Sequence, residues 1–61
     1  MEKLMYRIPE AAHVLGLGRT VVYAEMAAGR IQFVRRGRSR LVSAQALIDY
    51  VALLEAETAG V

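Results

Sequence analysis

The chain has 61 residues and no cysteine, and it carries a net charge of +2. So short a chain has a small hydrophobic core with little room for an enzyme active site, and without cysteine it has neither disulfides nor a thiolate zinc site. Its apolar runs are too short to span a membrane and its N-terminus lacks the apolar core of a signal peptide. We therefore expect one cytoplasmic domain over residues 1–61, with no membrane partner.

The charges are divided unevenly along the chain. All eight basic residues lie within residues 1–40, where only three acidic residues accompany them, whereas residues 41–61 carry three acidic residues and no basic one. Seven of the eight basic residues are arginine, whose planar guanidinium binds phosphate through paired hydrogen bonds. This distribution favours a polyanionic partner such as nucleic acid, although a basic surface that only promotes solubility would give the same count.

Two short helices are predicted in the first half of the chain. Pro9 marks a helix start after a short extended segment at residues 6–8, and Gly16 ends this first helix. A second helix is predicted over residues 19–28, and Gly29 ends it. Two helices around a glycine-bearing turn form a helix-turn-helix, whose second helix can enter the major groove of DNA.

The second helix has one apolar side and one side of small or polar residues. Val22 and Met26 fall on the side predicted to be buried. The opposite side consists of Thr20, Tyr23, Ala24 and Ala27. It can lie against a DNA groove while Arg19 reaches a phosphate, or it can simply face solvent.

A β-hairpin with arginine at its tip follows the two helices. Residues 31–35 and 39–42 favour strands, and Gly37 between them can adopt the positive φ of a tight turn. The apolar positions expected to pack on the helices are Ile31, Phe33 or Val34, Leu41 and Val42. Four arginines remain near the tip: Arg35, Arg36, Arg38 and Arg40.

The last predicted element is the longest helix. Ser43 is its predicted N-cap, and the helix runs from Ala44 to about Glu57. The expected buried stripe comprises Leu47, Tyr50, Val51 and Leu54. Ile48 and Leu53 lie off this stripe, which indicates either self-association, a protein partner, or a core that covers more of the helix.

Together these elements predict an α+β fold, mostly α: a small winged helix-turn-helix with two short helices, a two-stranded hairpin wing and a C-terminal helix. Such a domain binds one DNA duplex at two places. The second helix lies in the major groove, and the arginines of the wing follow the phosphates or enter a narrow minor groove.

The order and spacing of these segments resemble the MerR-like winged-helix excisionase family. The similarity extends over about residues 6–54. It is carried by Pro9-Glu10-Ala11-Ala12, Leu15-Gly16, Thr20-Val21-Val22-Tyr23, Gly29-Arg30-Ile31, Val34-Arg35, Gly37-Arg38 and Ala46-Leu47.

The resemblance implies a small phage or plasmid protein that binds double-stranded DNA in a bacterial host and acts with an integrase to direct site-specific recombination toward excision. It also implies cooperative binding to adjacent sites and DNA bending. The implied DNA-binding residues are Arg19, Thr20, Tyr23, Arg35, Arg36, Arg38 and Arg40. Gly18 stands where the family usually has a capping Ser or Thr, and Ala24 and Ala27 stand where basic residues are common. The second helix is therefore expected to make few contacts to bases.

Two other functions remain open at this point. A small MerR-like transcriptional regulator would have the same fold, and a protein-interaction module would use the arginine tip on an acidic protein surface. We expect no catalytic residue, cofactor or metal, because His13 is the sole histidine and no nucleophile or carboxylate pair accompanies it in the sequence.

Overall fold

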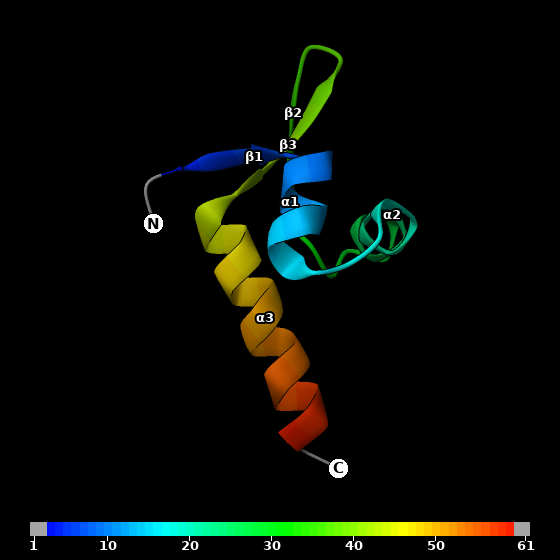
Figure 1. Cartoon of the computed structure of the whole chain (residues 1–61), viewed down its shortest axis with the longest axis vertical. Coiled ribbons are helices and arrows are strands. Elements are labelled where there is room, and N and C mark those ends of the chain that lie inside the picture. Colours follow the sequence, from blue (N-terminus) through cyan, green and yellow to red (C-terminus); the bar gives the residue numbers. More distant parts are fainter. Residues whose placement is uncertain (1–2, 60–61) are drawn as a thin grey trace.

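The computed structural model describes residues 3–59; residues 1–2 and 60–61 of the expected domain lie outside that range. Helices and strands follow one another as predicted, with one additional strand at the start (Figure 1). The elements are β1 (Met5–Arg7), α1 (Ile8–Leu15), α2 (Arg19–Ala27), β2 (Val34–Arg36), β3 (Ser39–Ser43) and α3 (Ala44–Ala59). The fold is a small, mostly helical α+β winged helix-turn-helix, as predicted.

The ends of α1 follow from local hydrogen bonds. The backbone N–H of Arg7 donates to Glu10 Oε1 at 3.1 Å, and Pro9 occupies the first turn, where its missing N–H costs nothing. Gly16 adopts the left-handed conformation, with φ of 73°, and its N–H donates to the His13 carbonyl. The next N–H, from Leu17, donates to Ala12 O at 2.9 Å, which completes a Schellman-type end.

The sheet has three strands rather than the two predicted for the hairpin alone. Their order is β1-β3-β2, and both pairs are antiparallel. Tyr6 of β1 lies opposite Val42 of β3, and both side chains are buried. The extended segment expected before α1 is therefore a paired edge strand, and Ile8 already belongs to the helix.

The hairpin differs from the prediction at its first strand. Pairing begins at Val34 instead of Ile31, and Arg36, expected in the turn, ends β2 opposite Ser39. Ile31 is buried within the connection from α2 to β2. The expectation that Phe33 or Val34 is buried was wrong, since both are exposed; the wing projects beyond the helices, so its first strand has nothing to pack against (Figure 1).

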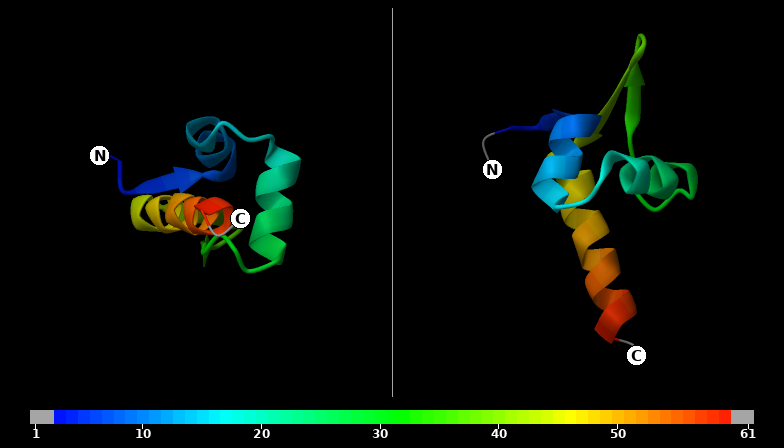
Figure 2. Two further views of the ribbon diagram at one scale, coloured as in Figure 1. Left: turned by 90° about the horizontal axis from the view of Figure 1, so that it is seen from below. Right: turned by 45° about the vertical axis from the view of Figure 1, so that its right-hand side comes forward.

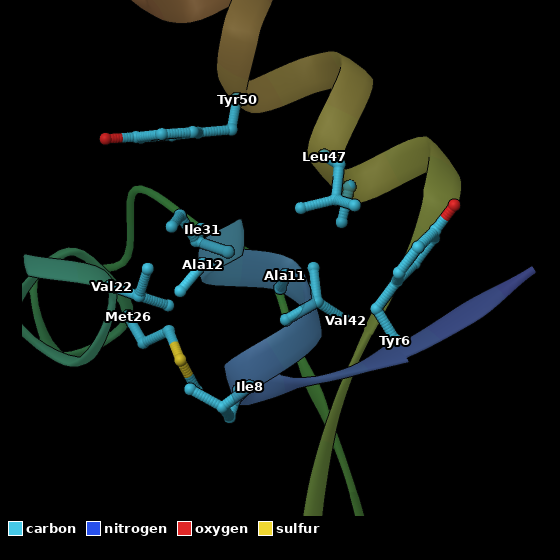
Figure 3. Packing of buried hydrophobic residues seen from close by; sticks show 11 residues of the cluster. Tyr6, Ile8, Ala11, Ala12, Val22, Met26, Ile31, Val42, Leu47 and Tyr50 are labelled. Atoms are coloured by element: carbon cyan, nitrogen blue, oxygen red, sulfur yellow. The ribbon is translucent and has the colours of Figure 1, made fainter. Parts of the chain in front are cut away.

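A small apolar core joins the three helices and the sheet. Val22, Ile31 and Val42 are its largest fully buried side chains, and they come from α2, the connection after it, and β3 (Figure 3). Val22 and Met26 are both buried, as the helical pattern predicted. The remaining buried members are Tyr6, Ile8, Ala11, Ala12, Ala46, Leu47 and Tyr50.

Helix α3 is only partly covered by the rest of the protein. The backbone N–H of Ala46 donates to Ser43 Oγ at 3.0 Å, so Ser43 caps the helix as predicted. Leu47 and Tyr50 are buried, but Val51, Ile48 and Leu53 are exposed. The far half of α3 extends past α1 and α2 (Figure 1). Within residues 3–59, no helix is long and apolar enough to cross a membrane.

Candidate nucleic-acid interface

Helix α2 presents the side that the sequence assigned to DNA. Its buried residues, Val22 and Met26, hold one side against the core. The residues predicted to face DNA are all exposed: Arg19, Thr20, Tyr23, Ala24 and Ala27. Gly18 is the N-cap and provides no side-chain hydrogen bond, so the exposed N–H groups at this helix start remain available to an anion such as phosphate.

The wing carries the other predicted contacts. Arg35, Arg36, Arg38 and Arg40 are all exposed, and Gly37 makes the turn with φ of 60°. Arg35 lies directly opposite Arg40 across the β2–β3 pair, so these two side chains share one face of the sheet. Helix α2 and the wing project toward the same side of the molecule (Figure 2). The seven predicted residues thus lie on two neighbouring projections.

Two of the predicted residues are in direct contact, together with a third that the sequence did not assign. The guanidinium carbon of Arg40 lies 5.9 Å from the centre of the Tyr23 ring and 5.8 Å from the centre of the Phe33 ring. These are cation–π distances. Phe33 was missed because a lone aromatic residue in a β-favouring run predicts a core position.

Two of the three basic residues elsewhere in the described chain are neutralised by carboxylates, and Arg7 is the exception. Lys3 pairs with Glu10, and Arg30 pairs with both Glu25 and Glu57. By contrast, within residues 3–59 the four wing arginines and Arg19 make no ion pair with a protein carboxylate. The uncompensated positive charge is therefore concentrated on α2 and the wing, where it attracts a polyanion most strongly.

An ionic network on the other side of α2 fixes this helix against α3. Arg30 Nε donates to Glu25 Oε2 at 2.6 Å, and its two terminal nitrogens donate to the two oxygens of Glu57, each at 2.6 Å. The Tyr50 hydroxyl donates to Glu25 Oε2 at 2.8 Å. Arg30 belongs to Gly29-Arg30-Ile31, one of the segments that resemble the excisionase family. Its guanidinium is nevertheless bound by two carboxylates, so Arg30 is a structural residue and not a free cation.

The pKa values of the network reflect these bonds. The hydrogen bond from Arg30, followed by that from Tyr50, holds the pKa of Glu25 below its ordinary value. The Arg30 guanidinium likewise lowers the pKa of Glu57, and the two carboxylates raise the pKa of Arg30. Burial raises the pKa of Tyr50, and its bond to Glu25 adds to that effect. All four groups are therefore held in the protonation states that keep the network intact at neutral pH.

No group of three or more His, Cys, Asp or Glu that could bind a metal ion occurs within residues 3–59. An open apolar groove of about 370 Å³ lies between α1 and α3. Its lining consists of Val14, Leu15, Leu47, Ile48, Val51, Ala52 and Glu55. This composition suits apolar contact with another surface and offers no pair of groups for acid–base chemistry.

Comparison with known proteins bears directly on this geometry. The helix-turn-helix domain profile matches residues 5–52, which comprise β1 to most of α3. The chain belongs to the helix-turn-helix domain family. This match confirms the helix-turn-helix that the sequence predicted, a type of domain whose second helix can enter the major groove of DNA.

A curated relative of this helix-turn-helix protein is described as a probable excisionase from Saccharopolyspora erythraea. The two are 46% identical over 55 residues, which cover 90% of this chain and 56% of the relative. The chain thus spans just over half the length of that relative. No solved structure gives a significant match. The similarity confirms the resemblance to excisionase-type helix-turn-helix proteins.

Proposed function

We propose that the protein is an excisionase, which binds double-stranded DNA and directs an integrase toward excision. The observation that carries this proposal is the joint position of α2 and the arginine wing beside one another, with their positive charges unpaired by protein carboxylates within residues 3–59. The similarity to a probable excisionase supports the choice among helix-turn-helix functions.

Helix α2 lies in the major groove in the proposed complex. Arg19 binds a phosphate at the start of this helix, while Thr20 and Tyr23 contact the groove. Ala24 and Ala27 are exposed and small, which allows close approach of the helix but gives no hydrogen bonds to bases.

The wing arginines bind the neighbouring backbone or a narrow minor groove. Arg35, Arg36, Arg38 and Arg40 provide four guanidinium groups along one short hairpin. With few hydrogen bonds from α2 to bases, the protein selects its site largely through DNA shape and flexibility, and it bends the duplex to bring both projections into contact.

Binding to adjacent sites is cooperative in this proposal. The apolar groove between α1 and α3 lies outside the α2 and wing surfaces, and its rim includes the exposed residues Val14, Ile48 and Val51. A neighbouring copy or the integrase covers this apolar surface when the complex assembles on DNA.

The direct test is a recombination assay with the partner integrase and its attachment-site DNA. We expect the protein to shift the products toward excision, and the Arg36→Ala/Arg38→Ala variant to lose this effect while remaining folded. An unchanged direction of recombination, despite DNA binding by the wild type, would reject the excisionase assignment. Repression or activation of a promoter reporter in cells without integrase would then identify a transcriptional regulator.

A further inference from the structure

Arg40 differs from the other wing arginines in its surroundings. Its guanidinium is near two aromatic rings that come from different parts of the chain, Tyr23 of α2 and Phe33 of the segment before β2. No such ring contact occurs for Arg35, Arg36 or Arg38 within the described residues. Arg40 is therefore placed where the second helix and the wing meet.

The sheet register explains why Arg40 reaches toward α2. Side chains alternate along β3, so Arg40 points to the same face as Val42, which is fully buried against the helices. Arg36 occupies the other face, because it neighbours Arg35 on β2 and Arg35 lies opposite Arg40. Arg40 thus points into the angle between α2 and the wing, whereas Arg36 points away from it.

The two rings hold the side chain but leave its hydrogen-bond donors free. A cation–π contact attracts the charge to the ring face and uses none of the N–H groups of guanidinium. Within residues 3–59, Arg40 makes no side-chain hydrogen bond or ion pair. Its donors remain available to a ligand, and a side chain already held in place loses less entropy when it binds.

Phe33 is otherwise hard to explain. It is the chain's sole phenylalanine and is 38% exposed. An aromatic residue that served only the core would be expected inside it, as Tyr50 is, with 3% exposed.

We propose that Phe33 is a positioning residue of the DNA interface: together with Tyr23 it fixes Arg40 so that its guanidinium binds a backbone phosphate between the α2 and wing contacts. This inference rests on the proposed binding of double-stranded DNA. It divides the wing into one arginine held by aromatic rings, which sets how helix and wing bind together on the duplex, and three exposed arginines without ring contacts, which add electrostatic affinity.

A double-mutant cycle tests this division, with binding to a mixed-sequence duplex followed by fluorescence anisotropy. Phe33→Leu removes the ring but keeps an apolar side chain, and we expect it to weaken binding about two- to fivefold, the effect of one exposed cation–π pair. The salt dependence should stay unchanged, because no charge is removed. Phe33→Tyr retains the ring and should bind like the wild type.

The cycle partners are Arg40→Ala and, as a matched control on the opposite face of the wing, Arg36→Ala. Phe33→Leu should cost nothing further in the Arg40→Ala background, and it should cost its full two- to fivefold in the Arg36→Ala background. An equal loss in both backgrounds, or no loss in the wild type, would overturn the positioning role.

Nuclear magnetic resonance of the free protein separates this inference from the function on which it rests. Ring currents should shift the side-chain protons of Arg40 upfield in the wild type, and Phe33→Leu should move them back toward ordinary values. If the wild type bound no DNA, the proposed function would fail, and these shifts would still decide whether the rings hold Arg40. Ordinary shifts in the wild type would overturn the arrangement itself.

Discussion

Removal of two arginines from the tip of the wing should change the salt dependence of DNA binding by a calculable amount. We count as phosphate contacts the five exposed arginines of α2 and the wing, which have no carboxylate partner within residues 3–59: Arg19, Arg35, Arg36, Arg38 and Arg40. At roughly 0.9 counterions per contact, the logarithm of affinity should fall with the logarithm of salt concentration at a slope of about −4.5. Arg36→Ala/Arg38→Ala removes two contacts and should give about −2.7.

The difference is large enough to measure by fluorescence anisotropy. Between about 50 and 200 mM salt the wild type should lose roughly 500-fold in affinity, and the double variant roughly 40-fold. Neither substitution should disturb the fold, because Arg36 ends an edge strand and Arg38 lies in the turn, both exposed.

A control for general charge effects is Lys3→Gln. Lys3 is already paired with Glu10 and shortly precedes β1, which lies on the other side of the molecule from α2 (Figure 1). Its removal should leave the slope unchanged. The reasoning would be refuted if Arg36→Ala/Arg38→Ala kept the wild-type slope, or if Lys3→Gln reduced it as much per charge.

Three further predictions concern stability. Ile31 is 1% exposed, so Ile31→Ala should lower the free energy of unfolding by about 2–5 kcal/mol. This is much of the ~3–9 kcal/mol expected for a chain of this size. Val14 is exposed, so Val14→Ala should change the free energy of unfolding little, and urea unfolding measures both variants. Gly16→Ala should destabilise the protein by about 1–2 kcal/mol, because the φ of Gly16 is 73°. Gly18→Ser, at φ of −73° and with open space around it, should stabilise the protein by roughly 0.5–1 kcal/mol through helix capping and a stiffer unfolded chain. The two substitutions should therefore shift Tm in opposite directions, and equal shifts would contradict the backbone argument. The pKa of Glu25 is lowered from an ordinary value of 4.5, so the ionised carboxylate stabilises the fold above that value. This contribution is lost as the pH falls through the lowered pKa. On acidification, the Tm of Glu25→Gln should therefore fall less than the Tm of the wild type.

The helices could be predicted from short stretches of sequence because their signals are local. Gly16 ends α1 in the left-handed conformation, and Ser43 caps α3 through its own hydroxyl. The 3.6-residue period likewise placed Val22 and Met26 in the core. Each of these outcomes depends on residues within one or two turns of each other.

The sheet was less predictable because its contacts join distant segments. Nothing near Tyr6 indicates that it lies opposite Val42, and this pairing turns the expected hairpin into a three-stranded sheet. Phe33 also looked like a core residue, yet the wing extends beyond the helices and leaves it exposed next to Arg40. Register and projection depend on which surfaces meet in three dimensions.

The sequence by itself determined the local elements and the charge of this surface. It has a glycine-bearing turn between two helices, followed by a hairpin with four arginines, and this pattern predicts a charged wing next to a DNA-facing helix. Only the tertiary structure decided which side chains surround each arginine. Arg30 is neutralised by Glu25 and Glu57, and Arg40 lies between Tyr23 and Phe33. The physical reason is that the charge of an arginine is a property of the residue, whereas its partners come from elements that only folding brings together.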